Sequence, residues 1–158
     1  IDAIKTSQRE LEKLSRSQPD NPEVWALLAQ AYGYHIPLQP MRAAFYGPKA
    51  HLSLERAVAL APENLRVNLV KGISELNTPT MFGGSDTAAL KSLSKAIEVF
   101  ENSDTAGYNW GHAEAYVWRG LAQIEQGNTE AALADWQAAI DIEPDYYWAK
   151  NLLKKNSL

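Results

Sequence analysis

The sequence has no cysteine in its 158 residues, so disulfides and thiolate zinc sites are excluded. It also lacks any stretch near the roughly 20 apolar residues that a membrane-spanning helix needs, and any signal-peptide core. Positive charge is not concentrated, because 15 Lys and Arg are interspersed with 19 Asp and Glu, for a net charge of −4. Without a basic stripe to follow phosphates, nucleic acid is not an expected partner.

Combinations of residues that carry catalysis are missing as well. No G-x-S-x-G, P-loop or nucleotide-binding glycine pattern occurs. His35, His51 and His112 have no second histidine on the same helix face, and Glu55, four residues after His51, predicts a surface ion pair. The segment 79–85 ahead of a helix predicts a turn and a helix cap rather than an anion site. We therefore expect no enzyme activity, no cofactor and no metal site.

The overall composition is that of a folded domain, with 46% hydrophobic and 22% charged residues. A length of 158 residues is sufficient for one sizeable core, and we predict a single domain. The chain begins at Ile1 rather than Met, so we expect a processed form or a piece of a longer protein.

One spacing of small, aromatic and proline residues occurs three times. The copy near the C-terminus reads Tyr116-x3-Gly120, Ala132-x3-Trp136-x2-Ala139 and Pro144. The copy near the N-terminus reads Trp25-x2-Leu28-Ala29-x2-Tyr32, Ala50-x3-Leu54-x2-Ala57 and Pro62, and a weaker middle copy has Gly72 and Ala89-x3-Leu93-x2-Ala96. Small residues let two helices approach closely, large ones fill the space beside them, and proline prevents the second helix from continuing.

This spacing resembles the tetratricopeptide repeat (TPR), a helix–turn–helix unit of about 34 residues. The resemblance implies an all-α solenoid of stacked helix pairs that serves as an interaction module. We predict helices at about 22–35, 49–61, 64–77, 86–101, 111–126 and 129–142, and a capping helix from Asp145. The predicted plan is a partial leading repeat (1–19), a repeat (21–62), a divergent repeat (63–101), a repeat (111–144) and the capping helix (145–156).

Long insertions distinguish the chain from a regular repeat array. The interval between the small residues of the paired helices is 12 positions in the last copy, 17 in the middle copy and 21 in the first. We expect the large side chains of the insertions and of the connection 100–112 to fold back onto the helices or onto a partner. These side chains are Tyr34, His35, Met41, Phe45, Tyr46, Met81, Phe82, Tyr108 and Trp110.

In TPR proteins the first helix of each pair lines a concave groove, and the matching positions here are unusually apolar. The Lys and Asn clamp with which some TPR domains bind chaperone peptides is absent. The predicted partner or ligand contacts are Tyr34, Arg66, Leu69, Ile73, Val117, Trp118, Leu121 and Ile124. Two interpretations stay open: the insertions or the C-terminal helix cover this groove, or it is open to a hydrophobic ligand or an amphipathic helix.

Two functions follow from these features. The first is a non-enzymatic scaffold that binds a segment of another protein, or a second copy of itself, through the groove or the inserted loops. The alternative is a soluble binder of a small apolar ligand, such as a transport accessory protein. The segments 79–84 and 110–116 also resemble parts of bacterial extracytoplasmic TPR proteins, including those that accompany tripartite solute transporters. This second resemblance implies an exported, periplasmic protein.

Overall fold

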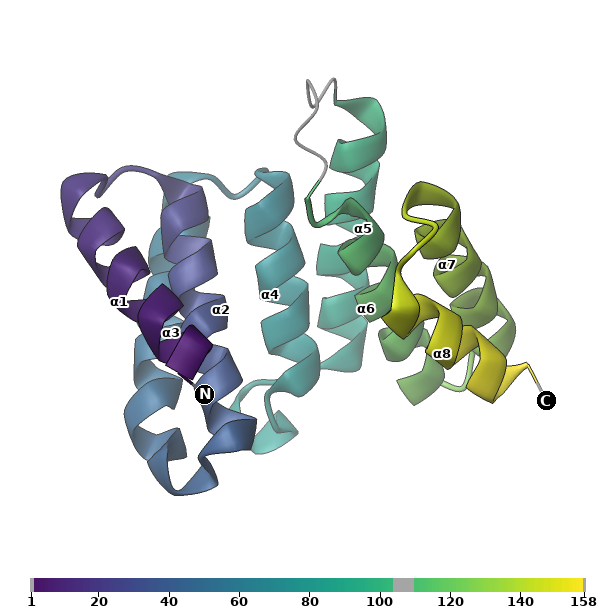
Figure 1. Cartoon of the computed structure of the whole chain (residues 1–158), viewed down its shortest axis with the longest axis horizontal. Helices are drawn as coiled ribbons and strands as arrows, with labels where there is room; N and C mark the ends of the chain where they lie inside the picture. The colour runs from purple at the N-terminus through teal and green to yellow at the C-terminus, as the bar shows by residue number, and fades with distance from the viewer. Residues whose placement is uncertain (1, 104–109, 158) are drawn as a thin grey trace. The chain divides into compact units, whose positions relative to one another are not determined.

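The computed structural model describes residues 2–103 and 110–157, and all regular structure in these ranges is helical (Figure 1). The expected all-α fold is therefore confirmed. The elements are α1 (Asp2–Ser17), α2 (Pro22–Leu38), η1 (Pro40–Arg42), α3 (Ala43–Leu60), α4 (Leu65–Asn77), η2 (Thr80–Phe82), α5 (Asp86–Asn102), α6 (His112–Glu125), α7 (Thr129–Ile142) and α8 (Tyr147–Asn156). Tyr108, one of the aromatic residues of the insertions, lies outside the described residues.

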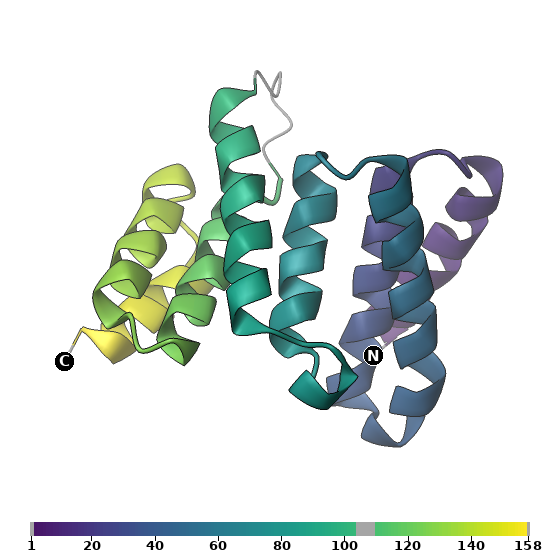
Figure 2. The same cartoon turned by 180° about the vertical axis from the view of Figure 1, so that it is seen from behind.

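The chain divides into two compact units, residues 1–71 and residues 72–158, with the boundary inside α4. The first unit contains α1, α2, α3 and the first half of α4, and the second contains the other half of α4 and α5 to α8 (Figure 2). Each unit has its own buried core. The single domain over 1–158, with the repeat boundaries given above, stays a prediction.

The starts of α2 and α5 follow local capping chemistry. The side-chain oxygen of Asn21 accepts hydrogen bonds from the backbone N–H groups of Glu23 and Val24, at 3.1 and 3.4 Å. Ser85 caps α5 in the same way and accepts from the N–H of Ala88 at 3.2 Å. Such caps satisfy backbone donors that have no partner inside the helix. The segment ahead of α5 is thus a turn and a cap, as predicted.

In the first unit, small residues allow the helices to approach closely. Ala29 of α2 and Ala57 of α3 are buried with Val67 and Val70 of α4 in one apolar cluster. A neighbouring cluster is built around Tyr32, which donates a 2.7 Å hydrogen bond to Glu12 of α1. This bond joins α1 to α2, so the leading helix is part of the unit.

The second unit repeats this principle. A Cβ on Gly120 of α6 would collide with the indole of Trp136 on α7, which is fully buried and donates to the backbone oxygen of Val117 at 3.3 Å. A Cβ on Gly72 would lie 2.5 Å from a side-chain carbon of Leu93 on α5. The predicted pairing of small and large residues between helices is therefore present.

The first insertion is helical rather than a loop, which corrects the predicted helices at 22–35 and 49–61. α2 continues to Leu38 with Pro37 in its last turn, and α3 begins at Ala43 and includes Pro48. Proline inside a helix costs a backbone hydrogen bond. Packing offsets this cost, because Tyr46 is buried and stacks on the buried ring of His35 at a centroid distance of 4.3 Å.

The second insertion depends on its two adjacent glycines. Gly83 has a φ of 95°, in the left-handed region that favours glycine. Gly84 is buried, and a Cβ there would overlap the backbone oxygen of Thr78. The N–H of Ser85 then donates to the backbone oxygen of Glu75 at 2.9 Å. These contacts fix the turn that carries η2 onto the end of α4.

Candidate functional site

The predicted groove residues of the first unit are largely inside the protein. Leu69 is fully buried. Arg66 is only 8% exposed, and its guanidinium lies 3.0 Å from a carboxylate oxygen of Glu23, so it links the start of α4 to the start of α2. Tyr34 is exposed at the surface of α2, where its hydroxyl accepts a hydrogen bond from Gln30 at 2.9 Å. Of these three residues, only Tyr34 offers a large surface to a partner.

In the second unit the predicted groove residues of α6 share one core with α7 and with the C-terminal helix α8. Val117 is fully buried in the core, and Leu121 and Ile124 pack against the same core together with Leu152 and Leu153 of α8. Ile73, at the start of the second half of α4, is also buried. The apolar residues of α6 therefore pack into a core that is built from α6, α7 and α8 together.

Trp118, also on α6, is partly buried. Its ring meets Trp148 of α8 in a T-shaped contact, with centroids 5.1 Å apart and planes at 80°. Its indole N–H donates to a carboxylate oxygen of Glu114 at 3.2 Å. Two contacts thus restrain the indole, while part of it remains accessible to solvent.

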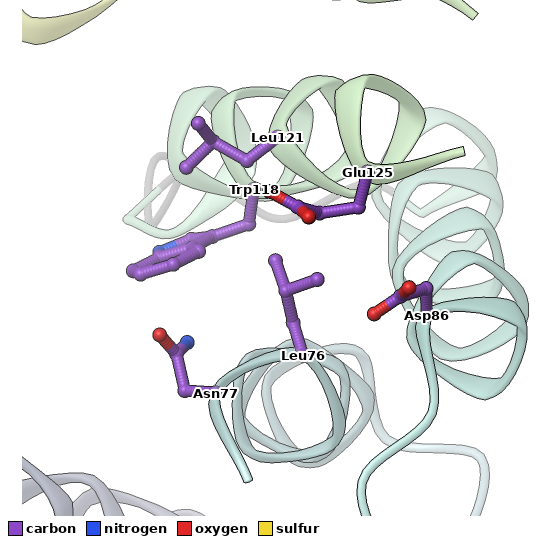
Figure 3. A pocket seen from close by; sticks show the side chains of 6 residues that line it. All are labelled: Leu76, Asn77, Asp86, Trp118, Leu121 and Glu125. Carbon is purple, nitrogen blue, oxygen red and sulfur yellow. The ribbon is translucent and has the colours of Figure 1, made fainter. Parts of the chain in front are cut away.

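A small pocket of about 230 Å³ lies where the end of α4, the start of α5 and α6 meet (Figure 3). Its lining consists of Leu76, Asn77, Asp86, Trp118, Leu121 and Glu125. In Figure 3, Leu76 points into the centre, the Trp118 indole and the Asp86 carboxylate lie on opposite sides, and the Glu125 carboxylate lies between them. The site therefore combines an aromatic wall with two acidic groups.

The sequence analysis identified only part of this pocket. Trp118 and Leu121 were predicted contacts, but Asn77, Asp86 and Glu125 were missed. The one local signal was Glu125, a carboxylate at the C-terminal end of α6, where the helix dipole disfavours negative charge. That signal marks Glu125 as unfavourably placed in its own helix, but it does not show which other helices surround this residue.

Polar contacts hold α6 on both of its neighbours. The guanidinium of Arg119 binds the carboxylate of Asp135 on α7 through two hydrogen bonds, at 2.9 and 2.5 Å. The hydroxyl of Tyr116 donates to a carboxylate oxygen of Glu101 on α5. Burial and this contact with Glu101 raise the pKa of Tyr116 to about 12. These groups position the helix, and their partners already satisfy them.

The large side chains of the two insertions differ in their burial. His35 and Tyr46 are buried, which agrees with the expectation that they fold back. Met41 on η1 is 98% exposed, and Met81 and Phe82 on η2 are 83% and 73% exposed. These three side chains do not fold back onto the helices, so a partner for them stays a prediction.

Comparison with known proteins gives one match to a repeat family and similarity in fold to solved structures. Residues 113–146 match the family model described as "Tetratricopeptide repeat", whereas comparison with curated proteins gives no match. The chain is also similar to a solved structure described as "Crystal structure of MamA", with a TM-score of 0.59 at 20% identity, over 97% of this chain and 76% of that one. A second, described as "Crystal structure of MamA protein", gives a TM-score of 0.54 at 20% identity, over 99% and 78%.

Two further findings concern residues 2–103 and 110–157. No helix there has both the length and the apolar character needed to cross a bilayer. No three His, Cys, Asp or Glu side chains there are grouped as metal ligands would be. The chain carries a tetratricopeptide repeat at residues 113–146 and has the helical-repeat fold of TPR proteins.

Proposed function

We propose that this protein is a non-enzymatic scaffold that binds a segment of another protein through its inserted turns. The observation that supports this most is the neighbouring pair Met81 and Phe82, both more than 70% exposed on η2. Burying such a side chain contributes roughly 1.5–3 kcal/mol. A partner that covers both would therefore gain substantial binding energy.

The turn that carries this pair is closed by its own backbone hydrogen bonds. The N–H groups of Phe82 and Gly84 donate to the backbone oxygen of Pro79, at 2.8 and 3.3 Å, and the N–H of Gly83 donates to that of Thr80 at 3.0 Å. A preformed turn loses little conformational entropy on binding. Methionine adds an adaptable contact surface, which suits a protein partner.

The alternative, a binder of a small apolar ligand, has weaker support. Pockets for such ligands usually measure about 300–1,000 Å³ and are mainly apolar. The pocket beside Trp118 measures about 230 Å³ and has two carboxylates in its lining. An exported, periplasmic location in a bacterium is proposed only from the resemblance of the insertions.

The proposal is tested with the double variant Met81→Ser/Phe82→Ser. Protein partners cross-linked to the wild-type chain should be lost, while the melting temperature stays unchanged, because both side chains are exposed. Leu52→Ser is the matched control, since Leu52 is 64% exposed on α3 and is not part of η1 or η2, and this variant should retain the partners. Equal capture by the double variant and the wild type would refute the proposal. Capture of a second copy of the chain alone would refute the choice of a different protein as partner.

A further inference from the structure

The pocket beside Trp118 has the chemistry of a site for a cation. An indole face attracts a guanidinium or ammonium group, and a carboxylate pairs with it. Neither Asp86 nor Glu125 forms an ion pair with another of the residues that the structure describes. Both residues are exposed, so their carboxylates are accessible to an external group.

The charge of the second unit supports the same conclusion. Residues 72–158 contain twelve Asp and Glu against six Lys and Arg, a net charge of −6. Residues 1–71 contain nine Lys and Arg against seven Asp and Glu, a net charge of +2. The field around the pocket thus favours the approach of a basic partner.

Glu125 is not explained by the stability of its own helix. It is the last residue of α6, where the negative end of the dipole repels a carboxylate. Asp86, in the first turn of α5, is by contrast favourable for its helix. Glu125 thus stands where its own helix disfavours a negative charge, and its carboxylate is directed toward the pocket.

The size of the pocket suits one side chain. At about 230 Å³ it is smaller than the usual site for a drug-sized ligand. The Trp118 indole is restrained by Glu114 and Trp148, so the aromatic wall is formed in advance. A long side chain with an apolar stem can lie along Leu76 while its charged end reaches the carboxylates.

From these observations we propose that the pocket lined by Trp118, Asp86 and Glu125 receives an arginine or lysine side chain of the partner protein. This inference rests on the proposed scaffold function and adds the chemistry of one partner residue. Arginine is the better fit, because its planar guanidinium both stacks on an indole and pairs with a carboxylate.

The test is a titration of the full chain with capped five-residue peptides that differ only at the centre: Arg, Lys, Gln or Glu. The indole N–H signal of Trp118, assigned with Trp118→Phe, is followed by NMR. The Arg and Lys peptides should shift this signal, with dissociation constants on the order of 1 mM, as expected for one side chain. The Gln and Glu peptides should not shift it. An equal response to the Gln peptide, or no response to either cationic peptide, would overturn the inference.

Charge-neutral variants separate binding from folding. Glu125→Gln should weaken binding of the Arg peptide several-fold, and its melting temperature should equal or slightly exceed that of the wild type. Asp86→Asn should also weaken binding of this peptide. It should cause a small loss of stability, because it removes a favourable negative charge from the first turn of α5. Glu130→Gln is the matched control, because it removes a carboxylate from the first turn of α7, outside the pocket lining, and should leave peptide binding unchanged. Unchanged binding by the double variant Asp86→Asn/Glu125→Gln would overturn the inference.

Failure of this inference is distinguishable from failure of the scaffold function. The variant Met81→Ser/Phe82→Ser should still bind the Arg peptide, because η2 contributes no residue to the pocket lining. If the wild-type chain captures its partner but ignores the cationic peptides, only the pocket inference is lost.

Discussion

At the scale of single residues, His35 is the most unusual group in the first unit. Its ring is fully buried, and neither of its nitrogens has a hydrogen-bond partner among the described residues. It stacks on Tyr46. Burial, together with the positive charges of Arg42 and Lys5, lowers the pKa of His35 below its ordinary value of 6.5. The folded chain therefore holds this imidazole in its neutral form.

The protein should consequently lose stability in mild acid. Above the unfolded pKa of about 6.5 the histidine is neutral in both states, and the stability it contributes is fully present. As the pH falls below that value, the unfolded chain takes up a proton that the folded chain does not, so the free energy of unfolding decreases until the folded pKa is reached. His35→Phe keeps an aromatic ring against Tyr46 and should make this decrease less steep. Melting temperatures between about pH 7.5 and 5 test this expectation, and an unchanged slope would contradict it.

At the scale of helices, the contact between α6 and α7 depends on the missing side chain of Gly120. The indole of Trp136 occupies the position where a Cβ would project. The repeat spacing had placed Trp136 in the helix that faces Gly120. Because Trp136 is fully buried, it has little room to move away.

Gly120→Ala should therefore destabilise the protein by about 1–3 kcal/mol through overpacking. Gly33→Ala is the matched control, since Gly33 lies inside α2 and a Cβ there meets no atom within 4 Å. That control should stabilise the chain by about 0.5–1 kcal/mol, because alanine is the better helix former. Denaturant unfolding measures both changes. A neutral or stabilising effect of Gly120→Ala would mean that α6 and α7 do not approach each other closely at this position.

At the scale of the whole molecule, the distribution of charge makes a prediction about salt. The second unit has a net charge of −6, and the proposed partner residue is positive. Raising the ionic strength from about 0.01 to 0.15 M shortens the Debye length from roughly 30 to 8 Å and screens this attraction.

Capture of the partner should therefore decrease over that range of salt, as measured by pull-down at each concentration. Contact through Met81 and Phe82 alone predicts a different result, because salt does not weaken the burial of apolar surface. Capture that stays constant or increases with salt would thus contradict a cationic contact with the second unit.

Much of the fold was predictable because its causes are local. Asn21 and Ser85 cap their helices through neighbouring N–H groups, and Gly120 with Trp136 identifies a helix pair from spacing alone. The helical first insertion was not predictable in this way. Its stability depends on the stacking of Tyr46 on His35, and these rings come from different helices.

The amino-acid sequence by itself determined the helical class, the TPR-type repeat at the C-terminal end and the capped helix starts, because residues close in the chain suffice for each. Only the tertiary structure decided that Leu69 and Val117 are buried, that α8 shares a core with α6 and α7, and that Met81 and Phe82 are exposed to solvent. It also brought Asp86 and Glu125 to one pocket with Trp118. The physical reason is that burial and proximity between helices depend on how their faces pack, which no single segment of sequence specifies.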